Sequence, residues 1–311
     1  MSIDPVIATK LDSLQPGATA FFTRQLQQID QRLLERKTPP LNGMRRFPLY
    51  PGIDPNAASF VRRMGEVTGT PKFKAEAGDD LPLVAFGAIE DEVKLHEMVL
   101  GFDYTAEDIA RAAFTGLDLS TEKARGALQR IEERRNQIIW HGHPALNLYG
   151  VLTHPLVGRY ALGVSGSAAI GVIQPAIVDA INSIADDSDD THKAEEVLIA
   201  SRVYRYLAGL YTAGDVSKNA LQLISESVDI DMGRINPCHE LNGAGPGGTD
   251  AMVIYSRDPD VCGIVLPKPA AQGTPKEVGH WRIEVPMVET CGGVICNYPG
   301  GMKIASFTDA R

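Results

Sequence analysis

The chain has 311 residues, of which 44 % are hydrophobic and 22 % charged, so it can fold around one large core or two to three smaller ones. A net charge of −9 argues against a surface whose main task is to grip phosphate backbones. Four cysteines are too few for a disulfide framework and suit a reducing compartment. The N-terminus lacks a signal-peptide core, and the longest weakly polar run, Tyr160 to Val178, is too interrupted to span a membrane. We therefore expect a protein made and kept in a cytoplasm.

The first 55 or so residues are expected to form an arm. Phe22, Leu26, Ile29 and Leu33 recur at helical spacing, so residues 21–35 are predicted to form an amphipathic helix. The prolines that follow impose an extended path that buries little by itself. We therefore expect a neighbouring copy of the chain to hold this arm.

Two strands with a long tip between them are predicted next. Ser59 to Thr68 and Ile89 to Leu100 have the composition and alternation of strands. The tip between them contains Lys72, Phe73 and Lys74. A two-stranded hairpin is only marginally stable in water, so this one is expected to lie on a surface supplied by something else.

Two helices follow the hairpin. Thr105 and Asp108 fit a capping box that begins a short helix, which runs to about Phe114. A longer helix is predicted from Thr121 to about Trp140, where Gly142 ends it. Its expected core stripe is Ala124, Leu128, Ile131 and Ile138, and its expected outward charges are Glu132, Glu133, Arg134 and Arg135.

Beyond Pro155 helices and strands alternate in the manner of an α/β region. The predicted elements are a helix from Pro175 to about Ala185, an acidic turn at Asp186–Asp190, a buried strand at Val197–Ala200, a helix from Val203, strands at Met252–Tyr255 and Val261–Leu266, a proline-rich loop at Pro267–Pro275 and a last β segment from Trp281 to Ile304.

Several motifs carry possible chemistry, and each fails on its context. Gly243 to Gly248 satisfies G-x-G-x-x-G, but a strand rather than a helix is predicted after it, so a flexible loop is favoured over a phosphate cradle. Gly163 to Ser167 is not a nucleophile elbow, which requires Gly-x-Ser-x-Gly. The acidic turn lacks the glycine and distal glutamate of an EF-hand loop.

The histidines and cysteines are the remaining candidates. His141 and His143, together with His154 or the run Cys238-His239-Glu240, contain zinc-binding residue types without a recognised ligand spacing. Cys291 and Cys296 are five residues apart, which in one strand points them to opposite faces as core thiols. We therefore predict no catalytic residue, no cofactor and no metal.

A series of short motifs nevertheless carries a resemblance. In order along the chain they are Asp79-Asp80-Leu81-Pro82, Gly101-Phe102-Asp103-Tyr104-Thr105, Leu117-Asp118, Asn136, His141-Gly142-His143, Leu148-Tyr149-Gly150-Val151-Leu152-Thr153-His154-Pro155, and Glu284-Val285-Pro286 through Tyr298-Pro299. In this order they resemble the major capsid proteins of tailed bacteriophages, in the branch related to encapsulin shell proteins. The resemblance covers roughly residues 55–165 and 280–306.

The resemblance implies an α+β chain with the Hong Kong 97 fold. It implies an N-terminal arm (1–55), an extended β-loop (56–101), a peripheral domain with a long spine helix (102–165), an axial domain (166–279) and closing strands of the peripheral domain (280–311). It also implies pentamers and hexamers in an icosahedral phage head, assembled in the host cytoplasm around double-stranded DNA, with portal, scaffold and decoration proteins as further partners.

Intersubunit contacts are expected at the arm, the hairpin tip and the long helix. The residues concerned are Lys72, Phe73 and Lys74 at the tip, Glu132 and Glu133 on a neighbour's helix, and Phe22 and Leu26 in the arm. Two alternatives remain open at this point: an encapsulin-like compartment that carries an enzyme cargo, and a soluble α/β enzyme that uses the loop from Gly243 to Thr249.

Overall fold

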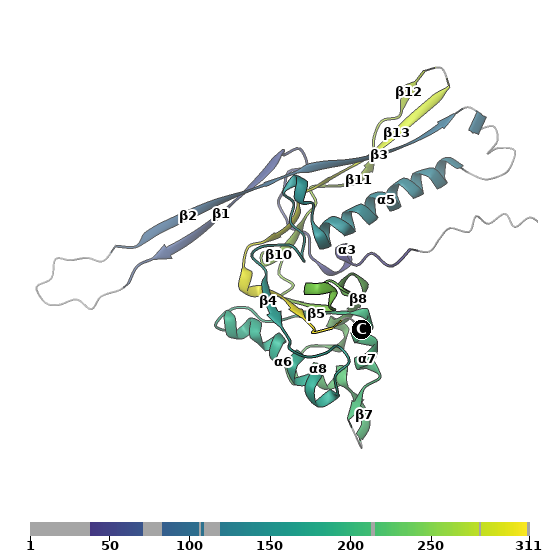
Figure 1. Ribbon diagram of the computed structural model, residues 1–311. Helices are drawn as coiled ribbons and strands as arrows, with labels where there is room; N and C mark the ends of the chain where they lie inside the picture. Colours follow the sequence, from purple (N-terminus) through teal and green to yellow (C-terminus); the bar gives the residue numbers. More distant parts are fainter. Residues whose placement is uncertain are drawn as a thin grey trace, which may run out of the picture.

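The computed structural model describes residues 38–70, 83–105, 107–108, 119–212, 215–279 and 281–309. A rounded domain lies beneath an elongated one, and a two-stranded ribbon projects from the elongated domain to one side (Figure 1). The predicted arm helix, the hairpin tip and most of the predicted short helix lie outside the described residues. No helix in the described ranges is long and apolar enough to cross a membrane.

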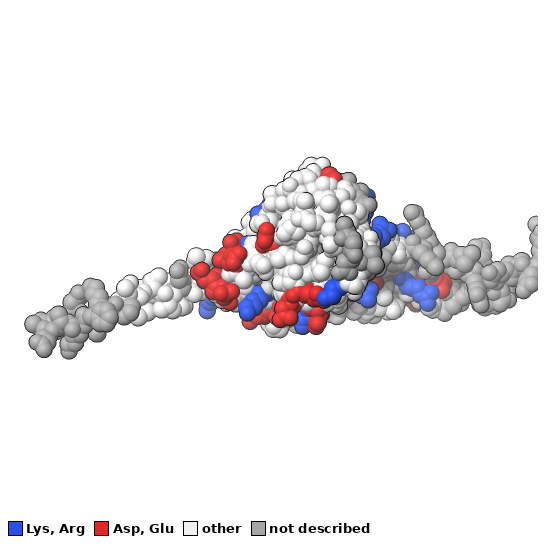
Figure 2. Space-filling view, turned by 90° about the horizontal axis from the view of Figure 1, so that it is seen from below, with Lys and Arg blue, Asp and Glu red and all other residues white. Residues whose placement is uncertain are grey.

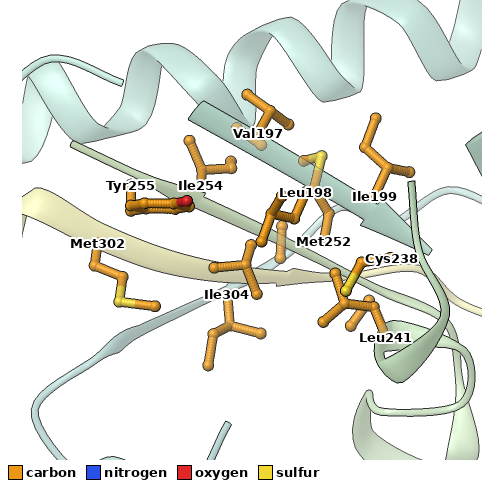
Figure 3. Packing of buried hydrophobic residues seen from close by; sticks show 14 of the residues in the cluster. Val197, Leu198, Ile199, Cys238, Leu241, Met252, Ile254, Tyr255, Met302 and Ile304 are labelled. Atoms are coloured by element: carbon orange, nitrogen blue, oxygen red, sulfur yellow. The ribbon is translucent and has the colours of Figure 1, made fainter. Parts of the chain in front are cut away.

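The rounded domain is built on a five-stranded mixed sheet in the order β4-β15-β9-β5-β8. The strands are β4 (Gly158–Ala161), β5 (Glu196–Ala200), β8 (Ile235–Cys238), β9 (Ala251–Tyr255) and β15 (Met302–Ser306). Every residue of β5 and β9 is buried, because helices pack against the sheet. Figure 3 shows side chains from β5, β9 and β15 meeting around Leu198 and Ile254, which forms one continuous apolar core.

Three helices accompany this sheet: α6 (Ile170–Asp187), α7 (Ser201–Ala208) and α8 (Ala220–Val228). The last helix begins at a capping box, in which Asn219 and Gln222 each bond the other's backbone N–H. The other short elements of the rounded domain are β6 (Tyr211–Thr212), β7 (Asp215–Asn219), η2 (Met232–Arg234), η3 (His239–Leu241), η4 (Pro246–Gly248) and η5 (Pro299–Gly301).

The elongated domain combines one long helix with a second sheet. The helix α5 (Leu119–His141) lies along β3 (His96–Thr105), which pairs over its full length with β13 (Arg282–Cys291). Ala127 and Ile131 pack with Met287 in a small separate apolar cluster. Its other elements are α3 (Gly43–Arg46), η1 (Pro144–Leu146), β10 (Cys262–Val265), β11 (Lys268–Gln272), β12 (Lys276–Val278) and β14 (Gly293–Cys296).

A close backbone crossing joins the end of α5 to the segment around Leu148–Gly150. Gly142 has φ +68°, and a Cβ there would lie 2.3 Å from the carbonyl oxygen of Leu148. A Cβ on Gly150 would likewise lie 2.3 Å from the Gly142 nitrogen. Only glycine fits both positions, which confirms the predicted helix end at Gly142 and explains it by tertiary contact.

Four sequence predictions are wrong in their extent. The predicted strand Ile89–Leu100 is two strands, β2 (Ala85–Lys94) and β3, which pair with different partners on either side of Leu95. The helix predicted from Pro175 begins at Ile170 and contains the proline within it. The predicted loop at 267–275 contains β11, and the predicted last β segment is divided among β13, β14 and β15. For the three β predictions, pairing partners distant in sequence decided the boundary.

The segment before the ribbon is held by its own subunit, contrary to the expectation that it buries little. Phe47 is buried, and its ring lies 5.4 Å from that of Trp140 and 4.9 Å from that of Tyr255. Tyr255 donates a hydrogen bond of 2.6 Å to the carbonyl oxygen of Arg46. This part of the chain therefore ties α5 to the core sheet.

Candidate functional site

The ribbon, formed by β1 (Ser59–Thr68) and β2, is largely exposed over its outer half. Its ten residue pairs run from Ser59 opposite Lys94 to Thr68 opposite Ala85, so directly opposite residues share a face. Val67 and Phe86 lie opposite each other and are 67 % and 71 % exposed. On the other face Ile89 is 70 % exposed. Apolar side chains thus point to solvent on both faces.

The ribbon's composition changes along its length. Near the root, Arg63 donates to Glu90 at 2.8 Å on one face. Farther out, the Phe86 ring covers Gly65, where a Cβ would lie 2.4 Å from the ring. This packing of an aromatic ring over a strand glycine restores some of the contact that glycine lacks. The outer half therefore presents an ordered apolar surface that its own chain does not cover.

The root of the ribbon is fixed by Arg62, whose side chain is only 8 % exposed. Its guanidinium binds Asp91 across the ribbon and donates to the Cys296 carbonyl oxygen at 3.1 Å and to Asn297 Oδ1 at 2.8 Å. Burial, followed by the Arg62 charge, lowers the pKa of the neighbouring His154 to about 4, while Asp91 opposes the shift. The ribbon is therefore anchored at one end and extends away from its own domain.

A hollow of about 640 Å³ lies beside this root. Its walls include Tyr50, Phe60, Arg62 and Tyr298, and the rings of Tyr50 and Phe60 are 5.5 Å apart. Among the described residues of its lining there is no histidine or cysteine, and Asp260 is the one carboxylate. It therefore offers a place for a side chain or a segment of polypeptide rather than a centre for acid–base or nucleophilic chemistry.

Of the predicted contact residues, only Glu132 and Glu133 lie within the described ranges. Both lie on α5, where Glu133 accepts from Arg130 at 2.7 Å and Glu132 lies 3.8 Å from Arg135. Phe22, Leu26, Lys72, Phe73 and Lys74 lie outside these ranges. Pairing of the tip lysines with a neighbour's glutamates stays a prediction.

Arg135 was predicted to point outward and does not. It donates at 2.7 Å to Glu289, whose side chain is fully buried on β13. Burial raises the pKa of the Glu289 carboxyl, and the Arg135 charge opposes that shift. Sequence periodicity missed this pair because the partner lies 154 residues away.

The run Cys238-His239-Glu240 belongs to a buried polar junction. Glu240 accepts from Asn42 at 2.8 Å, from Asn136 at 3.0 Å and from the Cys238 thiol at 2.9 Å. Burial alone would raise the pKa of this carboxyl, but these hydrogen bonds hold it below its ordinary value. The junction joins α3, α5 and η3, and its carboxylate is occupied by amide and thiol donors.

The other chemical candidates are also accounted for in structural terms. Among the described residues, no group of three or more His, Cys, Asp or Glu side chains could hold a metal. Cys291 and Cys296 lie in different strands, β13 and β14, rather than on two faces of one strand, and both are buried thiols. The Gly243–Gly248 loop passes through η4 into β9, so it lacks the helix that a phosphate cradle requires. Ser165 donates to Asp309 at 2.6 Å.

A family model of major capsid proteins matches residues 69–305 of the chain. The capsid of Myoviridae phage XM1 is similar in structure, with a TM-score of 0.78 and 13 % identity, over 91 % of this chain and 97 % of that one. A structure from Mycobacterium phage Adephagia has a TM-score of 0.62 and 11 % identity, over 92 % and 95 %. The capsid of a native GTA particle has a TM-score of 0.66 and 12 % identity, over 91 % and 95 %. No curated protein sequence matches the chain.

Proposed function

The chain belongs to the family of major capsid proteins, and from this premise we propose that its copies form pentamers and hexamers that close into an icosahedral phage head around double-stranded DNA. It is a structural protein of the virion capsid, with a Hong Kong 97-type fold. The proposal adds the capsomer stoichiometry, the DNA content and assembly in the host cytoplasm.

The ribbon is the observation that supports this proposal most directly. Two ten-residue strands pair only with each other and are anchored to the rest of the subunit at one end. Val67, Phe86 and Ile89 are each more than 60 % exposed. An isolated hairpin is marginal in water, and an exposed apolar surface of this kind marks an interaction site. We assign this surface to an adjacent copy of the chain.

The five proposed segments have the bounds that the resemblance to tailed-phage capsid proteins implies. Residues 1–55 form the arm, 56–101 the extended β-loop, 102–165 and 280–311 the peripheral domain, and 166–279 the axial domain around the capsomer axis. Phe22 and Leu26 of the arm, with Lys72, Phe73 and Lys74 of the tip, would contact neighbours, the lysines by pairing with Glu132 and Glu133. Surface pairs are weak singly, about 0.2–1 kcal/mol, but a closed shell repeats each one.

The proposal also includes partners other than further copies of the chain. We propose weak, nonspecific contact with packaged double-stranded DNA, because the chain carries a net charge of −9 and cannot attract phosphates over its whole surface. Portal and scaffold proteins, and a decoration protein, are further proposed partners. We also propose that the protein has no catalytic turnover, with no cofactor or metal required.

The alternatives are less well supported. The family match favours the phage head over an encapsulin-like compartment. A soluble enzyme that uses the Gly243–Thr249 loop has no support in the geometry of that loop, which continues into a strand.

Electron microscopy of the purified chain tests the proposal. We expect closed particles, or rings that precede them, and light scattering far above that of a 33.6 kDa monomer. A chain that stays monomeric at every concentration and ionic strength contradicts the proposal.

A shortened ribbon tests the role of the hairpin tip. Replacing residues 69–84 with an Asn-Gly turn closes the ribbon where Thr68 pairs with Ala85. The subunit should remain folded, while assembly fails or becomes sensitive to salt. Particles of unchanged size and stability would show that this part of the ribbon is not an intersubunit element.

A further inference from the structure

The rounded domain has a basic hollow on one flank. Its volume is about 460 Å³, and it is lined by Arg202, Arg205, Tyr206 and Gly209. Both arginines are exposed on α7, and neither forms an ion pair with any residue that the structure describes. None of the described residues that line it carries a carboxylate. Two guanidinium groups beside an open hollow fit an acidic segment of polypeptide.

The acidic turn Asp186–Asp190 lies on the other flank. Asp187 binds Lys303 of β15 at 2.5 Å, which places the turn beside that strand. The arginine-bearing α7 instead contacts β5 and β8. Since the sheet order is β15-β9-β5-β8, the two features are separated by two to three strand spacings, or roughly 10–14 Å of sheet.

Figure 1 agrees with this separation. In Figure 1, α6 lies to the left of the rounded domain and α7 to the right. In Figure 2, which keeps left and right, Asp and Glu atoms gather at the left and at the lower middle, with Lys and Arg atoms beside both groups, and further Lys and Arg atoms lie at the right. Asp186, Asp189 and Asp190 are exposed, and none of them forms an ion pair with a basic side chain that the structure describes. One flank is therefore acidic and the other basic.

Opposite charge on opposite flanks suits a ring of identical subunits. In a cyclic assembly each contact is heterologous, so one flank of a copy meets the other flank of the next. The ribbon points to the same side as the last turn of α6 (Figure 1). A single neighbour on that side would receive both the ribbon and the acidic turn.

We infer that the acidic turn of one copy docks beside the arginine hollow of the next copy, and that this contact sets the head-to-tail direction of the capsomer ring. The inference rests on the proposed function, and it names the partner surface within the axial domain. Complementary charge of this kind orients and selects partners more than it adds affinity. Exposed charges are also screened by salt, so ring formation should weaken as ionic strength rises.

Two charge-altered chains test the contact. The first, the basic-turn chain, carries Asp186→Lys with Asp189→Asn and Asp190→Asn. Asparagine is used because Asp189 and Asp190 have φ of 48° and 59°, and asparagine tolerates the left-handed region. The second, the acidic-hollow chain, carries Arg202→Glu and Arg205→Glu. Asp187 is left unchanged because it binds Lys303.

Each altered chain alone places like charges at every contact, so we expect the yield of assembled particles to fall at least tenfold. An equimolar mixture restores attraction wherever the two chains alternate. Six subunits can alternate around a ring, whereas five leave one contact between identical chains. The mixture should therefore form hexameric sheets or tubes, visible by electron microscopy, and few closed shells. A chain carrying both sets of changes should form closed shells again.

The doubly changed chain is the matched control, since it contains every substitution that blocks assembly in the separate chains. Circular dichroism confirms that each chain is folded. The inference is wrong if the two altered chains assemble as the unmodified chain does, or if the doubly changed chain stays as impaired as either. It is also wrong if the mixture closes shells as often as the doubly changed chain. If the unmodified chain never assembles, the proposed function itself fails.

Discussion

The ribbon and the core sheet both contain strands with apolar side chains, and these side chains have opposite environments in the two regions. Every residue of β9 is buried, whereas β2 has six consecutive exposed residues from Ala85 to Glu90. The central core strands β15, β9 and β5 have neighbours on both edges and helices against the sheet, while among the described strands β1 and β2 pair only with each other. The core therefore stabilises the subunit, and the ribbon's apolar surface is left for another molecule.

Truncation of a core side chain should have the largest effect on the stability of the subunit. Leu198 is fully buried at the centre of the apolar cluster. Leu198→Ala should lower the free energy of unfolding by about 2–5 kcal/mol, because it removes buried contacts and leaves a cavity. Urea unfolding followed by circular dichroism measures the change. A loss below about 1 kcal/mol would mean that the sheet is not the stability core.

The pH dependence of stability should report on the ribbon's root. His154 is buried with its pKa lowered from 6.5 to about 4, so the unfolded chain binds a proton in this window that the folded chain does not. Stability is full above pH 6.5 and falls as the pH drops toward 4, by about 3 kcal/mol at most. His154→Gln should flatten this part of the curve. An unchanged slope in the variant would assign the effect to other groups.

The anchoring arginine separates the ribbon's root from its outer half. Arg62→Met removes the donors to Asn297 and to the Cys296 carbonyl and leaves Asp91 without its partner. We expect a loss of about 1–3 kcal/mol in subunit stability. Hydrogen exchange should also increase in β1 and β2. Arg63→Met on the exposed face is the control, and it should change stability by less than about 0.5 kcal/mol. Equal effects of the two changes on stability and hydrogen exchange would show that Arg62 does not anchor the ribbon.

The smallest effect on the subunit should come from the ribbon's outer half. Phe86→Ser with Ile89→Ser replaces two side chains that are about 70 % exposed. The free energy of unfolding should change by about 0.5 kcal/mol or less, while assembly measured by light scattering falls sharply. Thr68→Ser, at the outer end of the partner strand β1, is the control. Loss of subunit stability without loss of assembly would reverse the roles assigned to ribbon and core.

The sequence predicts helices, caps and strands correctly where residues close together in the chain decide the structure. Residues 121–140 have helical periodicity, and the structure has α5 at Leu119–His141 with Ile131 and Ile138 buried as predicted. The capping box at Thr105 is present, since Asp108 N donates to Thr105 Oγ1 at 3.2 Å. The strand at Ser59–Thr68 has the predicted bounds.

The predictions are wrong where partners far away in the sequence decide the bounds of an element or the burial of a side chain. The alternation across Ile89–Leu100 continues through Leu95, although β2 ends before that residue and β3 begins after it. Arg135 sits among outward charges in sequence, yet Glu289 on β13 draws it inward. The arginine hollow on α7 has no sequence signal, because two exposed arginines in a short helix read as a solvated face.

The sequence by itself determined elements such as α5 and β1, because side-chain periodicity and capping act within a few residues. It also determined the resemblance, through the order of short motifs along the chain. Only the tertiary structure decided which apolar strands are covered and which are left bare, and which charges are paired. That decision depends on pairing across 100 residues or more, such as β3 with β13, and local pattern contains no information about such a partner.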